Sequence, residues 1–165
     1  MGIHVVNDWQ LYVHQEFEKV FEDLIKLVEN QKKNDPENYT NSLQYKRLKH
    51  ITRLILTDIP QNPNRRQYYL KKELKQLRRA KYLGRYRLLF LFQGTGKLIC
   101  YIWTNDEKTL RKDGSKSDPY KVFLKAFASD EKDYAGQILS SKHPLDSRSI
   151  EQLTQEQLIQ HPTVR

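Results

Sequence analysis

The chain has 165 residues, of which 38% are hydrophobic, and its Lys and Arg outnumber Asp and Glu to give a net charge of +9. Ten Tyr, six Phe and two Trp argue against disorder and for one domain with a real core. A single Cys excludes an intrachain disulfide, and five scattered His show no zinc-type spacing, so we expect neither a metal nor another cofactor. With neither a signal-peptide profile nor an apolar run of membrane length, the chain is predicted to be cytoplasmic, without membrane contact.

The first 58 residues predict a strand followed by two helices. Residues 3–13 mix β-branched and aromatic side chains typical of a strand, with an irregularity at Asn7-Asp8. Apolar residues at i, i+3 and i+4 then predict helices from His14 to Asn34 and from Asn41 to Asp58, which should pack as an antiparallel pair. The apolar stripes comprise Phe17, Val20, Phe21, Leu24, Ile25 and Val28 in the first helix, and Leu43, Leu48, Ile51, Leu54 and Ile55 in the second. Opposite the second stripe lie Lys46, Arg47, Lys49 and Arg53.

The most basic stretch of the chain leads into a predicted β-meander. Residues 71–87 contain eight Lys or Arg and one Glu, a balance of +7, and the predicted strands are 79–82, 85–92 and 98–104. Because side chains alternate across a strand, Arg79 and Lys81 should share one face, as should Arg85 and Arg87. The face opposite Arg87, with its apolar residues, should lie on the helices. The uncovered face would then be cationic, which favours a phosphate backbone as its partner.

Two further helices are predicted after the meander. Ser117-Asp118-Pro119 is a good helix start, and residues 147–160 form a short amphipathic pattern. The predicted fold class is α+β, an antiparallel sheet covered on one side by the N-terminal helical hairpin, with a further helix after the last strand. We place the domain at residues 1–129 and a polar C-terminal extension at 130–165.

The cationic face suggests metal-free RNA cleavage as one possible chemistry. The 2′-hydroxyl of RNA can attack the adjacent phosphate, and guanidinium groups suit the charge that develops there. Candidates for proton transfer are Lys81, Asp106, Glu107 and Tyr120. No His lies in the hairpin sequence or its immediate flanks, which argues against a His–His mechanism and leaves only the distant His4 and His14 as open alternatives. The alternatives are solvated surface charges, a core position for Tyr120, and ion pairs between the hairpin arginines and carboxylates of the first helix.

Four segments in order, DWQLYVHQEFEKVFEDL, NDPENY, RAKYLGRYRLLF and IWTNDEKTLRKDGSKSDPYKVFLKAF, resemble the YhaV family of RelE-like type II toxins. The resemblance covers residues 8–128 and implies a RelE-like fold and a metal-independent mRNA endonuclease that stops translation. It also implies a PrlF-like antitoxin with an AbrB-type DNA-binding domain, contact with operator DNA only through that antitoxin, and action at the ribosome. The spacing from Lys81 to Gly84 is one residue shorter than the family pattern, which bears on the strand register.

The resemblance and the charge pattern together nominate two groups of site residues. The catalytic candidates are Arg79, Lys81, Arg85, Arg87 and Glu107. The RNA-binding candidates are Lys72, Lys75, Arg78, Asn105, Asp106 and Arg111. The alternatives are a RelE-fold protein that binds a protein target as ParE relatives do, a co-repressor bound to its antitoxin, and a degenerate toxin.

Overall fold

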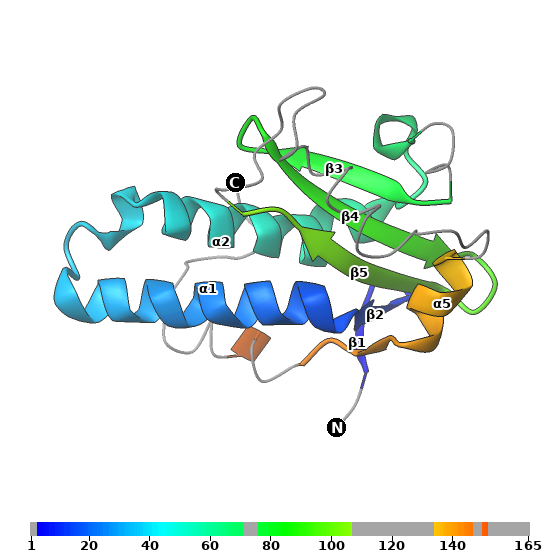
Figure 1. Cartoon of the computed structure of the whole chain (residues 1–165), viewed down its shortest axis with the longest axis horizontal. Helices are drawn as coiled ribbons and strands as arrows, with labels where there is room; N and C mark the ends of the chain where they lie inside the picture. The colour runs from blue at the N-terminus through cyan, green and yellow to red at the C-terminus, as the bar shows by residue number, and fades with distance from the viewer. Residues whose placement is uncertain (1–2, 71–75, 107–133, 147–149, 152–165) are drawn as a thin grey trace.

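The computed structural model describes residues 3–70, 76–106, 134–146 and 150–151. It confirms an α+β architecture in which helices α1 and α2 lie side by side against one face of a twisted sheet (Figure 1). None of the helices in these ranges is long and apolar enough to cross a membrane.

The N-terminal residues form a hairpin where we predicted one irregular strand. β1 (His4–Val6) pairs antiparallel with β2 (Trp9–Val13), and the turn between them is Asn7-Asp8. Both turn residues have positive φ, 50° and 69°, a conformation that Asn and Asp tolerate better than other non-glycine residues. The side-chain Nδ2 of Asn7 also donates to the Pro60 carbonyl at 2.9 Å, which connects the turn to the helical layer.

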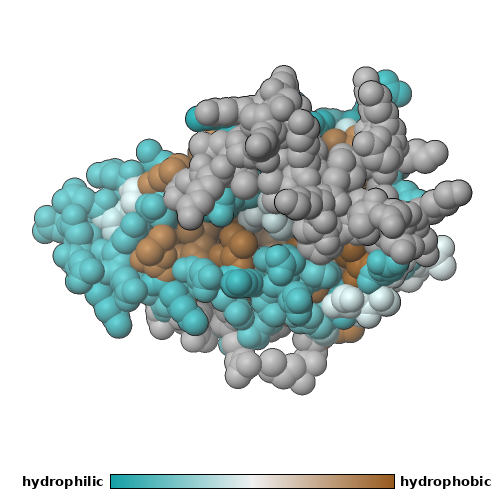
Figure 2. All heavy atoms as spheres, in the orientation of Figure 1, coloured by the Kyte–Doolittle hydropathy of each residue, from teal (hydrophilic) through white to brown (hydrophobic). Residues whose placement is uncertain are grey.

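The two predicted helices are present with small corrections. α1 (Gln15–Asn34) buries its apolar stripe, and α2 (Leu43–Arg53) begins after the N-cap Ser42, whose hydroxyl accepts from the Tyr45 amide. α2 continues as a π-helical turn (Leu54–Asp58) and α3 (Ile59–Gln61), beyond the predicted end at Asp58. The stripe assignment was wrong at Leu43, which is 42% exposed, and Arg47 is buried where we expected a cation on the open face. Apolar surface is visible in the seam between α1 and α2 (Figure 2). Short 3₁₀ turns lie at Tyr39–Asn41 and Arg66–Tyr68.

The sheet is mixed, which corrects the prediction of an antiparallel sheet. β3 (Arg78–Tyr82), β4 (Tyr86–Gln93) and β5 (Leu98–Thr104) form the predicted antiparallel meander. The strand order is β1-β2-β5-β4-β3, and β2 runs parallel to β5 from Gln10↔Leu98 to Val13↔Tyr101. The helical layer carries the chain from β2 to the far edge before the meander returns, and that crossover gives β2 and β5 the same direction.

Both faces of the sheet are apolar, and each is covered. Leu88, Phe90 and Tyr101 belong to the core that includes α1 and α2. Leu89, Leu91, Cys100 and Ile102 lie in a second cluster with Ile138 of α5 (Tyr134–Ser140), which lies near the end of β4 and the start of β5 (Figure 1). Cover on one side only was therefore a wrong prediction, because the second face also carries apolar residues that require burial. Burial there raises the pKa of the Cys100 thiol to about 12.

The described part of the chain after residue 129 packs on the rest of the fold. β6 (His143–Pro144) pairs antiparallel with β2, and the Leu145 amide donates to the Leu11 carbonyl at 3.1 Å. Leu145 and Ile150 join the core of α1 and the sheet. The helix predicted after Pro119 lies outside the described residues, as does nearly all of the one predicted at 147–160.

Candidate nucleic-acid interface

The β3–β4 hairpin brings three of the predicted cationic residues to one end of the sheet. Its loop is Leu83-Gly84-Arg85, with positive φ at the first two residues and a hydrogen bond of 3.0 Å from the Arg85 amide to the Leu83 carbonyl. Glycine suits the φ of +80° at the centre of this tight turn. The loop sets a regular register, with Lys81 directly opposite Arg87.

Lys81 and Arg87 carry like charges at directly opposite positions, an arrangement that usually destabilises a sheet. Arg79 lies opposite Leu89, so its side chain shares the face of Lys81 and Arg87, away from α1 and α2. Lys81 and Arg85 are exposed, and Arg79 is half-buried, with Nη2 at 3.4 Å from the carbonyls of both Gln67 and Tyr69. A cluster that costs stability locally is a candidate for function.

Arg87 is the most enclosed of these cations, with 7% of its surface exposed. Its Nη1 donates to the carbonyls of Gly84 at 2.7 Å and Tyr86 at 2.9 Å, which folds the guanidinium back over the turn. Neither Nε nor Nη2 makes a hydrogen bond to a residue that the structure describes. Within the same ranges, no carboxylate of α1 forms an ion pair with Arg85 or Arg87, so that alternative does not hold there.

Side chains from the end of β5 fix the backbone of Arg87. β5 stops at Thr104, opposite Leu88, so the ladder leaves Arg87 without a strand partner on that side. The Asn105 side chain replaces it: Oδ1 accepts from the Arg87 amide at 2.8 Å, and Nδ2 donates to the Arg85 carbonyl at 3.2 Å. The Thr104 hydroxyl donates to the Arg87 carbonyl at 2.9 Å. Asn105 is fully buried, so in this structure it positions the hairpin.

A second buried arginine, from α2, lies beneath the hairpin on its helical side. Arg47 Nη2 donates to the Tyr82 hydroxyl at 3.2 Å and to the Asn105 carbonyl at 2.8 Å, and its guanidinium lies 4.5 Å from the Tyr86 ring centre. Tyr82 and Thr104 oxygens are 2.7 Å apart. Because the single Thr104 proton goes to the Arg87 carbonyl, Tyr82 is the donor in this contact. Burial raises the pKa of Tyr82, which therefore remains a neutral donor.

His50, also on α2, brings an imidazole beside the hairpin, although the hairpin sequence and its immediate flanks contain no His. Its ring stacks on Tyr82 with centroids 6.5 Å apart and an angle of 23° between planes, and Tyr82 stacks in turn on Tyr86 at 5.4 Å and 24°. Partial burial, followed by the positive charges of Arg53 and Lys49, lowers the pKa of His50. Sequence reasoning missed both Arg47 and His50 because only the packing of α2 on the hairpin brings them there.

The remaining predicted site residues divide into two groups. Arg78 lies opposite Phe90, on the helical face, with its guanidinium 4.6 Å from the Tyr69 ring and 5.3 Å from the Phe92 ring, so it does not join Arg79 and Lys81. Asp106 is exposed directly after Asn105. Outside the described residues lie Lys72, Lys75, Glu107, Arg111 and Tyr120.

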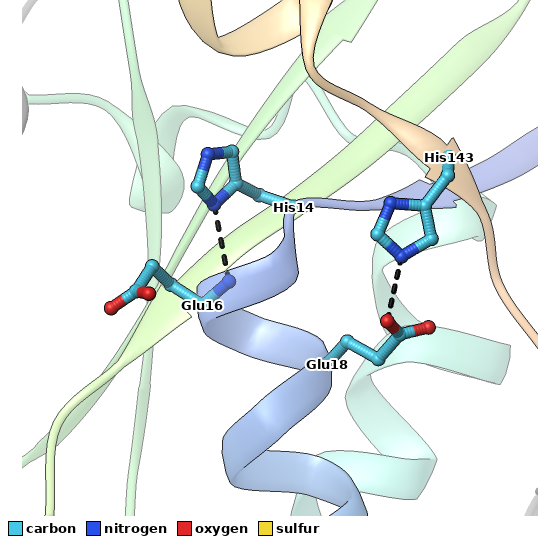
Figure 3. Close-up of polar contacts among 4 residues, drawn as sticks. All are labelled: His14, Glu16, Glu18 and His143. Carbon is cyan, nitrogen blue, oxygen red and sulfur yellow. Dashed lines mark hydrogen bonds and ion pairs between the residues drawn. The ribbon is translucent and has the colours of Figure 1, made fainter.

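A second polar cluster lies at the start of α1, and its contacts are structural (Figure 3). His14 is the N-cap, and its Nδ1 accepts from the Glu16 amide at 3.2 Å, while His143 Nε2 lies 2.7 Å from Glu18 Oε1 and ties β6 to α1. Burial is the main cause that lowers the pKa of His14. Among the described residues, no three His, Cys, Asp or Glu gather as a metal site would require.

Comparison with known proteins agrees with the sequence resemblance. Residues 11–133 match a family model, Toxin_YhaV, described as a toxin with endonuclease activity, of a toxin–antitoxin system. The chain is 39% identical over 126 residues to the ribonuclease toxin YhaV of Escherichia coli K12, covering 73% of this chain and 82% of that protein. It is 36% identical over 158 residues to toxin YhaV of Escherichia coli O6:H1, covering 92% and 95%. No solved structure shows significant similarity.

Proposed function

Because the chain belongs to the YhaV family of toxins with endonuclease activity, we propose that it cuts messenger RNA at the tip of the β3–β4 hairpin and thereby stops translation. The observation that carries this proposal is the set of cations that the hairpin loop brings together, Lys81, Arg85 and Arg87. Arg85 is exposed and can bind a phosphate directly, whereas Arg87 is buried and supports phosphate binding through its fixed positive charge at the hairpin tip.

The proposed reaction needs no metal. The 2′-oxygen of the RNA attacks the adjacent phosphorus, the bond from phosphorus to the 5′-oxygen breaks, and a 2′,3′-cyclic phosphate and a 5′-hydroxyl result. Arg79 and Arg85 bind the phosphate oxygens, and the fixed charge of Arg87 helps to stabilise the negative charge that grows on them in the transition state. The Lys81 ammonium protonates the departing 5′-oxygen, and the 2′-hydroxyl proton passes to a base, for which Glu107 remains the candidate.

The buried residues around the hairpin have a positioning role in this proposal. Asn105 and Thr104 hold the Arg87 backbone, and Arg47 joins Tyr82 to Asn105, so three elements converge on one arginine. Fixed donors need no reorganisation as the reaction proceeds, which is the main source of electrostatic catalysis. For Asn105, which we predicted to bind RNA, we propose a role that its hydrogen bonds to the Arg85 and Arg87 backbone support, namely to position these two arginines.

We further propose a PrlF-like antitoxin with an AbrB-type DNA-binding domain as the partner, which links the toxin to operator DNA. A net charge of +9 favours an acidic antitoxin surface, and the exposed Lys81 and Arg85 are the groups that it should cover. The ribosome is the proposed place of action on mRNA.

The test compares the purified full chain with Arg85→Ala and Arg87→Ala, with EDTA present, with and without ribosomes. Each variant should lose at least about 10²-fold in cleavage rate, the usual result of removing one preorganised charge-stabilising donor. Lys26→Ala, which removes an exposed charge from α1, should cleave like the wild type. Mapping the fragment ends tests the proposed bond cleavage.

Two results would contradict the proposal. Undiminished cleavage by both arginine variants would move the active site away from the hairpin. RNA that is bound and never cut, by a folded wild type under all conditions, would favour a toxin that acts by binding.

A further inference from the structure

We propose that His50 is a stacking platform for an unpaired RNA base on the helical side of the β3–β4 hairpin. This inference rests on the proposed function and deepens it by assigning a base-contacting residue on an element outside the hairpin. It also extends the RNA path from the cationic face of the hairpin, over its tip, to the surface of α2.

The geometry of the aromatic residues supports a platform that is open at one end. His50, Tyr82 and Tyr86 form a row of nearly parallel rings, and Arg47 closes the row on the Tyr86 side at 4.5 Å. Tyr82 and Tyr86 are buried, whereas His50 is exposed, so the imidazole is the only one of the three rings that a base can reach. Proteins commonly recognise single-stranded RNA by stacking bases on aromatic side chains, His included.

The row of rings lies on the helical side of the hairpin that carries the proposed cleavage site. Tyr82 follows Lys81 on β3, and its cross-strand partner Tyr86 stands between Arg85 and Arg87. A base on His50 would therefore belong to a nucleotide that is reached over the hairpin tip from the phosphate bound by the cations. The spacing between His50 and the cations is set by the packing of α2 on Tyr82, which shares its strand pair with Lys81 and Arg87.

The surroundings of His50 also suit RNA. Lys49 and Arg53 are close enough to lower its pKa, whereas Asp58, whose carboxylate lies 3.5 Å from Arg53 Nε, raises it. Lys49 can bind a phosphate next to the stacked base, while Arg53 is engaged with Asp58. Because the pKa of His50 is lowered, the imidazole is neutral at pH 7. A base can therefore stack on the ring without removing water from a charged group.

A neutral imidazole near an RNA site could alternatively act as a general base. The fold argues against this role, because Tyr82 and Tyr86 face the helices, whereas Lys81 and Arg87 face the other side of the sheet. The two roles respond differently to substitution. Phenylalanine preserves a stacking surface and cannot transfer a proton.

The experiment measures cleavage of an mRNA fragment and the Kd for the same fragment with 2′-deoxy substitution, which cannot be cleaved by 2′-hydroxyl attack. His50→Ala should weaken binding about 5-fold or more, the lower end of the effect of removing a base-stacking aromatic residue. His50→Phe should bind within about 2-fold of wild type, and both variants should keep the wild-type pH profile of the cleavage rate. Tm measurements on each variant confirm that the packing on Tyr82 survives.

Each other outcome overturns the inference in a distinct way. Equal loss of cleavage in both variants with unchanged Kd would make His50 an acid–base residue. Wild-type behaviour of His50→Ala would remove it from the site and leave the proposed function intact, provided that the Arg85 and Arg87 variants are inactive. A wild type that neither binds nor cuts RNA would overturn the proposed function and this inference together.

Discussion

The backbone of Arg87 is held at both its amide and its carbonyl by side chains that follow the last strand. Thr104 and Asn105 supply the hydrogen bonds that a longer β5 would supply with its own backbone. Because these side chains replace the backbone of β5 after Thr104, the tip of the β3–β4 hairpin extends past the end of β5. The tip can then meet a ligand as large as RNA while its conformation stays fixed.

Asn105→Ala should lower both stability and cleavage. The Arg87 amide and the Arg85 carbonyl each lose a partner, at a total cost of about 1–3 kcal/mol in the free energy of unfolding. Cleavage falls because both arginines lose their fixed positions. Urea unfolding and cleavage assays measure the two effects, with the exposed Asn41→Ala as the control. Lost cleavage at unchanged stability would instead indicate that Asn105 touches the RNA.

At the scale of the elements, the start of α1 depends on a titratable group. Most N-caps are Ser, Thr, Asp or Asn, whereas here the cap is His14, whose Nδ1 accepts a hydrogen bond from the backbone amide of Glu16 (Figure 3). An imidazolium carries protons on both nitrogens and cannot accept this hydrogen bond. The cap therefore exists only while His14 is neutral.

His14→Asn should make the protein less sensitive to acid. Because the folded-state pKa of His14 is lowered, its contribution is complete above the unfolded value near 6.5 and is lost as pH falls below it. Asn caps at any of these pH values, so the variant should keep about 1 kcal/mol that the wild type loses between about pH 7.5 and about pH 5. Unfolding in urea at both pH values measures this difference.

The control for this comparison is Gln15→Asn, an exposed change at the next position. On acidification, Gln15→Asn should lose as much unfolding free energy as the wild type does. If His14→Asn loses the same amount, His14 is not a pH-sensitive cap. Some acid sensitivity should remain in every variant, since burial also lowers the pKa of His4 and of His50.

For the whole molecule, the uneven distribution of charge, more than the net charge, decides where RNA should bind. The net charge is +9, and residues 71–87 alone contribute +7, from eight cations and one Glu. α1, in contrast, carries five carboxylates and four lysines, a net charge of −1, and Glu18 is engaged with His143 of β6. RNA should therefore approach the hairpin end of the sheet and avoid the surface of α1.

The salt dependence of RNA binding tests whether RNA contacts the cationic end of the sheet. The Kd for the uncleavable RNA should rise steeply from about 50 to about 200 mM salt, because phosphate contacts release counterions. Arg85→Ala should reduce the slope of log Kd against log salt by about 0.7, the value for one contact to a single strand. Lys26→Ala makes the same change in net charge and should leave the slope unchanged. Equal effects of the two variants would show that only total charge matters.

The sequence by itself determined the local elements and the family. Helix α1 follows from apolar residues at helical spacing, and the β3–β4–β5 meander follows from alternating and β-branched runs around turn residues. Alternation along β3 and β4 also placed Arg79, Lys81 and Arg87 on one face. These features depend on neighbours in the chain, and sequence patterns record such neighbours directly.

Tertiary structure alone decided which distant residues meet. The parallel pairing of β2 with β5, the cover of the second face by α5, and the burial of Arg47 all depend on contacts between segments far apart in the chain. His50 reads in the sequence as one polar residue of an amphipathic helix, and only the packing of α2 on Tyr82 makes it part of the site. Local patterns state which face of an element is apolar; the partner that covers that face is chosen by the packing of the whole chain.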